Sequence, residues 1–179
     1  MSHFELQPHL AGELLELRPL RADDWEALFK VASDPMIWEQ HPAQDRYQEE
    51  AFKAFFQEAL ESRGALVVID RKTQEIIGSS RYFGYDPVNS EVEIGWTFLA
   101  RDFWGGQYNR EMKRLMLEHA FRFLDRVVFL VGPENMRSRR ACEKIGAVLI
   151  GSRKKTERHG MVRESVVYEI RKPEIVAKG

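Results

Sequence analysis

The stretch that decides the fold is EVEIGWTFLARDFWGGQYNREMKRLMLEHAFRF, residues 91–123. Residues 91–99 alternate polar and apolar side chains and are rich in β-branched and aromatic types, which predicts a strand. Residues 111–123 place apolar side chains at helical spacing, with Lys113 and Arg114 expected on the exposed surface, which predicts a helix. A short loop between them holds Gly105 and Gly106.

A strand that passes through a glycine loop into a helix presents free backbone N–H groups at the positive end of the helix dipole. Such a loop favours a bound anion, above all a phosphate or pyrophosphate. A strand–helix connection that uses glycine only for tight packing explains the same residues equally well, so this stretch alone leaves both interpretations open.

Composition narrows the class of protein. The 179 residues are 44% hydrophobic and 31% charged, with a formal net charge of −1. This balance is typical of one globular domain and gives no indication of nucleic-acid binding. The single cysteine excludes an internal disulfide, and the five histidines show no metal-ligand spacing. No apolar run has membrane-spanning length, and the N-terminus lacks a signal peptide's apolar core, so we expect a cytoplasmic protein without a membrane or metal partner.

The rest of the chain supplies strands and helices around this stretch. We expect a single domain over residues 1–179, with a loosely held lead-in at 1–12 and the core at 13–172. Asp23 or Asp24 is expected to cap a first helix, and Gly64 to end a second. The predicted elements are a strand at 14–20, helices near 25–32 and 48–62, a hairpin at 65–86, a buried strand at 126–131, a short helix at 138–145 and a terminal hairpin turning at 158–160.

Four segments in this order resemble the GNAT superfamily of acetyl-CoA-dependent N-acetyltransferases, closest to the branch of ribosomal-protein N-terminal (alanine/serine) acetyltransferases. They are LRPLRADDWEALF with SDP, EIIGSSRYF, EVEIGWTFLARDFWGG with NREMKRLMLEHAF, and ENMRSRRACEKIGA, within residues 17–170. The resemblance implies a single-domain α/β GNAT fold. That fold has a mixed, mostly antiparallel sheet of about seven strands flanked by about four helices.

The resemblance also implies how acetyl-CoA binds as cosubstrate. Family members carry an R/Q-x-x-G-x-G/A loop, and Trp104 and Gly105 match the W-G form common in this branch, whereas Gln107 and Asn109 replace a glycine and a small residue. A non-glycine residue can still donate its backbone N–H where it needs no positive φ. The implied diphosphate-binding amides are those of Gly105, Gly106, Gln107, Tyr108, Asn109 and Arg110, beside Trp104. The backbone of Thr97, Phe98 and Leu99 is expected to bind the pantetheine where the central strand splays from its parallel neighbour, and Arg140 to pair with the 3′-phosphate.

For catalysis, direct attack of an amine on the thioester needs a proton acceptor. Glu93 on the central strand is the first candidate, although it could simply be an outward-facing carboxylate, and Glu91 has the same facing. Asn135 and Ser138 match an N-x-x-S element of this branch; Asn135 would hold pantetheine or a water, and Ser138 would donate to the leaving thiolate. Both residues could equally cap the short helix. Cys142 stands where many relatives carry a tyrosine acid, and is expected to be a small core residue.

Further expectations concern the acceptor. Trp38 and Tyr85 are predicted to shape its pocket, and Arg153, Lys154 and Lys155 to face solvent or an acidic partner. The sequence therefore predicts an N-acetyltransferase that acts on a small-molecule or peptide amine as a monomer or homodimer. The alternative is a GNAT-fold module that has lost catalysis and binds a ligand or partner.

Overall fold

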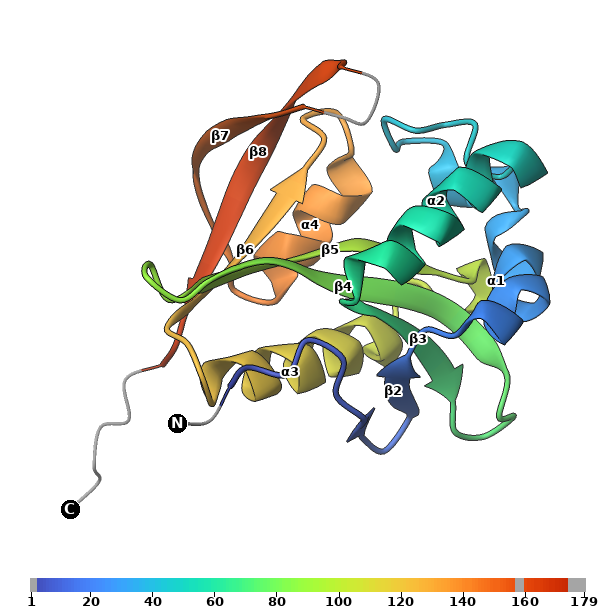
Figure 1. The fold of residues 1–179 in the computed structure, drawn as a ribbon, viewed down its shortest axis with the longest axis horizontal. Helices are drawn as coiled ribbons and strands as arrows, with labels where there is room; N and C mark the ends of the chain where they lie inside the picture. Colours follow the sequence, from blue (N-terminus) through green and yellow to red (C-terminus); the bar gives the residue numbers. More distant parts are fainter. Residues whose placement is uncertain (1–2, 157–159, 174–179) are drawn as a thin grey trace.

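In the computed structural model, which describes residues 3–156 and 160–173, the stretch 91–123 forms a strand, a loop and a helix (Figure 1). The strand is β5 (Glu91–Leu99) and the helix is α3 (Gln107–Phe121), with the short 3-10 turn η3 (Arg101–Phe103) between them. The helix begins four residues earlier than its apolar pattern predicts, because Gly106 is its N-cap and the polar residues 107–110 form its first turn.

Eight strands form one sheet in the order β1-β2-β3-β4-β5-β6-β8-β7. The β5–β6 pair is parallel and the other pairs are antiparallel, as expected for a mixed, mostly antiparallel sheet. The helix α3 makes the crossover that a parallel pair requires. The other strands are β1 (Leu10–Ala11), β2 (Leu15–Pro19), β3 (Ala65–Asp70), β4 (Ile76–Asp86), β6 (Arg126–Val131), β7 (Val148–Thr156) and β8 (Val162–Arg171). The turn predicted at 158–160 lies mostly outside the described residues.

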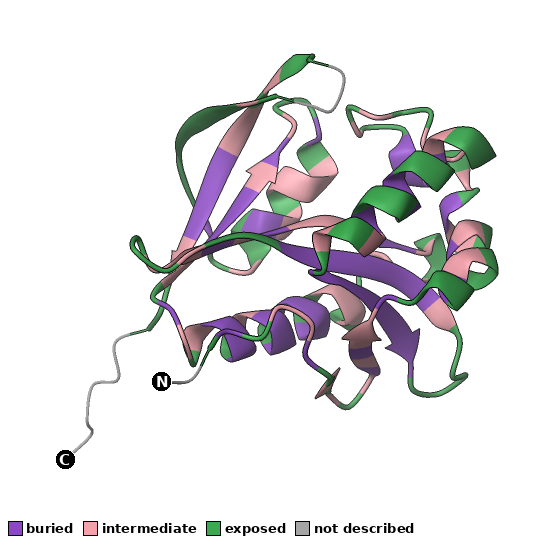
Figure 2. Ribbon diagram, in the orientation of Figure 1, coloured by how far each residue is buried: buried purple, intermediate pink, exposed green. Residues whose placement is uncertain are grey.

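Helices cover both faces of the sheet (Figure 1). On one face α3 and α4 (Met136–Lys144) contribute to a core with the buried side chains of β2, β4 and β6. On the other face α1 (Trp25–Ala32) and α2 (Glu49–Ser62), preceded by the 3-10 turns η1 (Ala22–Asp24) and η2 (Pro35–Trp38) respectively, form a second core rich in aromatic rings. Figure 2 shows the buried residues concentrated on the central strands and the inner side of α3. The site described below lies where these two layers meet β5 and β6.

The segment before Gly12 is packed, so the expectation of a loosely held lead-in is wrong for its described part. Phe4 is 6% exposed and its ring lies 5.1 Å from that of Tyr82 and 5.4 Å from that of His119. A ring nitrogen of His119 is also 2.8 Å from the carbonyl oxygen of Glu5. The strand β1 belongs to this segment and pairs with β2. It brings the number of strands in the sheet to eight, one more than expected.

A buried carboxylate fixes α3 against β2. Both oxygens of Glu111 accept backbone N–H groups, those of Glu13, Leu14 and Leu15, at 2.8–2.9 Å. Gly12 leaves room for this contact, since a Cβ there would lie 2.6 Å from the carboxyl carbon of Glu111. The start of α3 is thereby held at a defined position relative to the sheet.

Neither predicted helix cap forms as expected. Asp24 is the N-cap residue of α1, but its side chain makes no capping hydrogen bond to that helix; its carboxylate instead accepts from the Arg18 guanidinium at 2.8–2.9 Å and from the backbone N–H of Arg21. The helix α2 ends at Arg63, which adopts the left-handed conformation with φ 53°. Gly64 instead permits a close approach to β4, because a Cβ there would lie 2.1 Å from the carbonyl oxygen of Tyr82.

Candidate active site

The two parallel strands separate part-way along their length. Pairing joins Glu91 to Arg126, Val92 to Val127 and Glu93 to Val128, after which β5 and β6 continue unpaired and diverge (Figure 1). The divergence confirms the expected splay. Beyond Glu93, the backbone groups on this side of β5 face a gap in the sheet instead of a neighbouring strand. We call this opening the β5–β6 gap.

A β-bulge lies in β5 beside this gap. Ser79 pairs with Phe98 but Arg81 pairs with Gly95, so β5 contains one extra residue. That residue is Trp96, whose φ of 51° is unusual for a bulky side chain. The bulge reverses the alternation of side chains after it, because one inserted residue shifts the two-residue period. The hydroxyl of Thr97 therefore points toward α3, and the ring of Phe98 joins the α1–α2 core.

The loop before α3 begins at the far end of β5, where the gap also ends. Gly105 has a φ of +70°, which favours glycine, whereas Gln107 and Asn109 are helical and need no positive φ. No side chain caps α3, and a Cβ on Gly106 would have nothing within 4 Å. The first-turn amides thus face open space at the positive end of the helix. A hollow of about 300 Å³ adjoins them, lined by Leu14, Asp102, Phe103, Trp104, Gly106, Gln107 and Tyr108.

Side chains around this loop hold it in shape. The indole N–H of Trp104 donates to the carbonyl oxygen of Leu99 at 2.8 Å, and the hydroxyl of Tyr108 donates to Asp70 at 2.8 Å. One carbonyl expected to face the pantetheine, that of Leu99, therefore already accepts a hydrogen bond. Arg137 from α4 lies over the Trp104 ring, with its guanidinium carbon 3.9 Å from the ring centre.

The arginines of α4 differ in whether they are free to bind an anion or are held by hydrogen bonds within the fold. Arg140 is exposed and available to an anion. Arg139 is committed to the fold, because it donates to the Tyr168 hydroxyl at 3.1 Å and the Pro133 carbonyl at 2.8 Å. Sequence reasoning missed Arg137, although it lies in the same ENMRSRR segment as Arg140 and contacts Trp104 beside the glycine loop in the structure.

Glu93 is the last β5 residue paired with β6, at the entrance to the gap. Its side chain is 12% exposed, and one oxygen lies 3.5 Å from Lys155 Nζ. Burial raises the pKa of the Glu93 carboxyl, an effect that Lys155, Arg153 and Arg81 oppose without cancelling. Gly95 leaves room for this carboxylate, since a Cβ there would lie 3.0 Å from Glu93 Oε2. A buried carboxylate with a raised pKa in an opening is suited to accept a proton near neutral pH.

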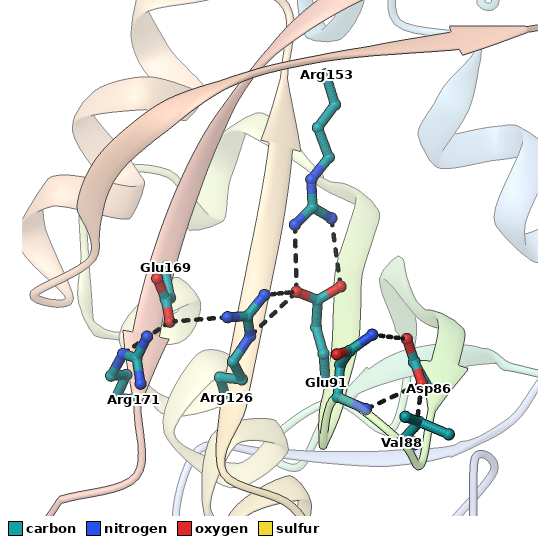
Figure 3. A network of polar contacts seen from close by, with 8 residues as sticks. Asp86, Val88, Glu91, Arg126, Arg153, Glu169 and Arg171 are labelled. Atoms are coloured by element: carbon teal, nitrogen blue, oxygen red, sulfur yellow. Dashed lines mark hydrogen bonds and ion pairs between the residues drawn. The ribbon is translucent and has the colours of Figure 1, made fainter.

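Glu91 has the same facing but different chemistry (Figure 3). Arg126 and Arg153 both bind its carboxylate, the latter at 3.2 Å. Burial acts to raise the pKa of Glu91, but the bonds from Arg153 and Arg126 outweigh it and lower the pKa. The network continues through Glu169, which lies 3.8 Å from Arg126 and 3.0 Å from Arg171. Glu91 therefore links β5 to β6 and β7 through its two arginine partners. These contacts do not support a role for Glu91 as a substitute base.

Cations and aromatic rings surround Glu93. Trp96 lies between Arg81, whose guanidinium carbon is 4.4 Å from the ring centre, and Lys155, whose Nζ is 3.9 Å from it. Phe83 packs against Trp96 at 5.2 Å. Arg81 is 2% exposed, and its Nε and Nη2 have no hydrogen-bond partner among the described residues. Burial lowers the pKa of Arg81 to about 10. No local motif could reveal this cluster, because its members come from three strands.

Asn135 and Ser138 meet at the start of α4, which begins two residues earlier than predicted. The Asn135 side chain accepts the backbone N–H of Ser138 at 3.3 Å, so Asn135 is the N-cap and Ser138 is not. Asn135 is 7% exposed. Cys142 is buried, as expected for a small core residue, and burial raises the pKa of its thiol to about 11.

The structure does not place the two predicted acceptor aromatics beside Glu93. Trp38 is 2% exposed, and its indole N–H donates to the carbonyl oxygen of Ala32 at 2.8 Å. Trp38 is therefore a core residue of the α1–α2 layer. Tyr85 is 37% exposed but packs against Phe4, on the sheet face opposite Glu93. Phe83, two residues earlier, is the β4 aromatic that lies near Glu93's partner Lys155.

Lys113 does not lie on the outer surface of α3, where it was expected. The side chain of Lys113 is buried, with the residue 7% exposed, and its Nζ donates a hydrogen bond to Thr97 Oγ1 at 2.8 Å. Lys113 thus lies on the buried side of α3, together with Met112 and Met116. Within residues 3–156 and 160–173, no cluster of His, Cys, Asp or Glu is arranged to hold a metal ion. No helix in the same ranges is long and apolar enough to cross a membrane.

Comparison with known proteins agrees with this geometry. Residues 15–148 match the family model described as acetyltransferase (GNAT) domain. The uncharacterized N-acetyltransferase YnaD of Bacillus subtilis (strain 168) is 28% identical over 141 residues, covering 77% of this chain and 81% of YnaD. A GCN5-related N-acetyltransferase from Brucella melitensis has a similar fold, with a TM-score of 0.79 and 21% identity over 92% of this chain and 79% of that one. Spermidine N-acetyltransferase from Vibrio cholerae, solved with CoA and spermine, has a TM-score of 0.66 and 17% identity over 89% and 96% of the two chains.

Proposed function

Because the chain belongs to the acetyltransferase (GNAT) domain family, we propose that it transfers the acetyl group of acetyl-CoA to a primary amine by direct attack in a ternary complex. The acceptor would be a small-molecule amine or a peptide N-terminus, and the protein would act in the cytoplasm as a monomer or homodimer. The observation that carries the proposal is one continuous arrangement. The β5–β6 gap has Glu93 at one end and the uncapped start of α3 at the other.

The residues of this arrangement fit a CoA-type ligand. Gly105 permits the turn, the space beside Gly106 is open, and the first-turn amides of α3 lack a capping side chain. These features favour a diphosphate held by the amides from Gly105 to Arg110. The gap-facing backbone of Thr97 and Phe98 would pair with the pantetheine amides, while Arg137 and Arg140 would supply positive charge for phosphate. When bound, acetyl-CoA supplies the activated acyl group.

The protein's part in the reaction is to position the amine and remove its proton. Glu93 would accept that proton, directly or through a water, and its raised pKa brings it closer to that of a useful base at neutral pH. Asn135 would orient the pantetheine or a water, and Ser138 would donate to the departing sulfur. Proximity in the gap supplies a further part of the acceleration.

Two measurements test the proposal. Calorimetry should detect CoA and acetyl-CoA binding at or below millimolar concentration, and a thiol-release assay with a panel of amines should show acceptor-dependent production of CoA. Glu93→Gln should lower the rate by roughly 100-fold, most strongly at pH values where Glu93 is ionised and the acceptor amine is still protonated. An absence of CoA binding contradicts the whole proposal, and an unchanged pH profile in Glu93→Gln removes Glu93 from the mechanism.

A non-catalytic binding module is the second candidate, favoured by Gln107 and Asn109 in place of the small residues of the family loop. The same thiol-release assay distinguishes the two functions. Binding of CoA without release of thiol to any amine in the panel would indicate the module.

A further inference from the structure

Lys113 lies on the α3 side of the β5–β6 gap. Its Nζ donates to Thr97 Oγ1 at 2.8 Å and lies 5.3 Å from the centre of the Phe129 ring. Thr97 and Phe129 belong to β5 and β6, at positions beyond the last paired residues, Glu93 and Val128. The charged end of Lys113 is therefore held against the gap by both of the diverging strands.

This ammonium has no negative partner in the described parts of the chain, residues 3–156 and 160–173. Its three N–H groups have one hydroxyl acceptor, Thr97 Oγ1, which also hydrogen-bonds to Ser80 Oγ at 2.9 Å. The neighbouring thiol of Cys142 has a pKa raised by burial to about 11, so it stays protonated at neutral pH and provides no negative charge. A methionine of similar length would fill the same space without the desolvation cost of a charge. The fold alone does not account for a lysine here.

The charge is nevertheless retained near neutral pH. Burial lowers the pKa of the Lys113 ammonium to about 8, so most molecules carry the proton at pH 7. The face of the Phe129 ring and the Thr97 hydroxyl both stabilise a cation. A fixed positive charge therefore adjoins the unpaired backbone of the gap, ready for a negative group that enters or forms there.

We propose that Lys113 stabilises the negative charge that forms on the sulfur of coenzyme A when the thioester bond breaks, an inference that rests on the proposed acetyl transfer. The acceptor nitrogen forms a bond to the acetyl carbon, and the carbon–sulfur bond breaks. The sulfur leaves with the electron pair as a thiolate, and the proton of the acceptor nitrogen passes to Glu93 and then to water. Lys113 keeps its own proton throughout and acts through its charge.

The test compares CoA with desulfo-CoA, which lacks the thiol, in the full-length protein at pH 7.5. The wild-type protein should bind CoA about tenfold or more tightly than desulfo-CoA, since stabilising a thiolate adds affinity only when sulfur is present. The ultraviolet difference spectrum between the two complexes should show thiolate absorbance, and Cys142 cancels in that difference. In Lys113→Met both the preference and the absorbance should disappear, while kcat falls about 10- to 100-fold at nearly unchanged KM for acetyl-CoA.

Lys144→Met is the matched control, because it removes one positive charge from an exposed position at the end of α4. It should keep the wild-type preference and spectrum. Equal affinity of the wild-type protein for CoA and desulfo-CoA, without a thiolate signal, overturns the role of Lys113 and leaves the proposed acetyl transfer intact. Because this comparison uses only the wild-type protein, it does not depend on whether the Lys113→Met variant folds. Failure to bind either compound contradicts the proposed function instead.

Discussion

The two carboxylates of β5 show what a sequence can predict about a single residue. Alternation along the strand predicts that Glu91 and Glu93 face the same way, and they do. It contains no information about partners: Glu91 forms ion pairs with Arg126 and Arg153, whereas Glu93 forms one with Lys155, at 3.5 Å. The pKa values consequently move in opposite directions. Lys113 illustrates the same limit, since helical periodicity cannot show that the opposing strands leave a gap for it.

The raised pKa of Glu93 has a consequence for stability. A carboxyl whose folded pKa lies above its unfolded value stabilises the fold fully below the unfolded pKa, and this contribution is lost as pH rises through the folded pKa. At neutral pH the ionised Glu93 therefore costs free energy. Glu93→Gln should raise the free energy of unfolding by on the order of 1 kcal/mol at pH 8 and have little effect at pH 4.

Urea denaturation at the two pH values checks this prediction. The matched control is Glu118→Gln, which alters an exposed ion pair with Arg114 on α3 and should change stability little at either pH. A destabilised Glu93→Gln at pH 8 would mean that the ion pair with Lys155 outweighs the cost of burial.

At the scale of elements, periodicity predicts β5, β6 and the body of α3, because each has an apolar face against a core. It predicts boundaries less well. The first turn of α3, residues 107–110, carries polar side chains and extends the helix beyond its apolar pattern. The bulge at Trp96 is also invisible in the pattern, since it depends on the register with β4. The family resemblance predicts the splay of β5 from β6, whereas the residues of either strand do not.

The uncapped start of α3 allows a prediction about this element. Gly106 has the extended backbone of an N-cap (φ −113°, ψ −156°), so Asp or Asn should fit there and cap the helix. Both substitutions should raise stability by a few tenths of a kcal/mol, with a further gain for Asp from the helix dipole. Both should weaken CoA binding by occupying the amides, and Asp should weaken it about tenfold more than Asn because its charge repels a diphosphate.

Thermal denaturation and calorimetry at low and moderate salt measure the two effects separately. Gly106→Asn is the charge-matched control for Gly106→Asp. The difference between them should shrink as salt rises. Unchanged CoA affinity in both variants would place the diphosphate away from α3.

At the scale of the whole molecule, the terminal hairpin of β7 and β8 contacts the central strand β5. β6 and β8 lie between β7 and β5 in the strand order, yet Arg153 and Lys155 of β7 reach Glu91 and Glu93 of β5 (Figure 3 shows the first pair). Arg153 is exposed, as expected, and also pairs with Glu91, whereas Lys155 is half-buried over the Trp96 ring and departs from the expectation that it faces solvent or an acidic partner. A contact more than sixty residues apart depends on the twist and curl of the entire sheet, which local sequence patterns do not encode.

This arrangement makes the hairpin a determinant of the pH range of the proposed reaction. Lys155 lowers the pKa of Glu93 against the larger effect of burial, so removing its charge should raise that pKa further. A base must be deprotonated to act, and the acidic limb of the profile of kcat/KM against pH should therefore move to higher pH in Lys155→Met. The rate at pH 6 should fall about three- to tenfold relative to wild type, while the rate at pH 8.5 should stay nearly equal. Lys155→Arg keeps the positive charge over Trp96 and should retain the wild-type profile. A uniform loss of rate at all pH values in Lys155→Met would instead assign Lys155 to acceptor binding, because loss of binding does not depend on the protonation of Glu93.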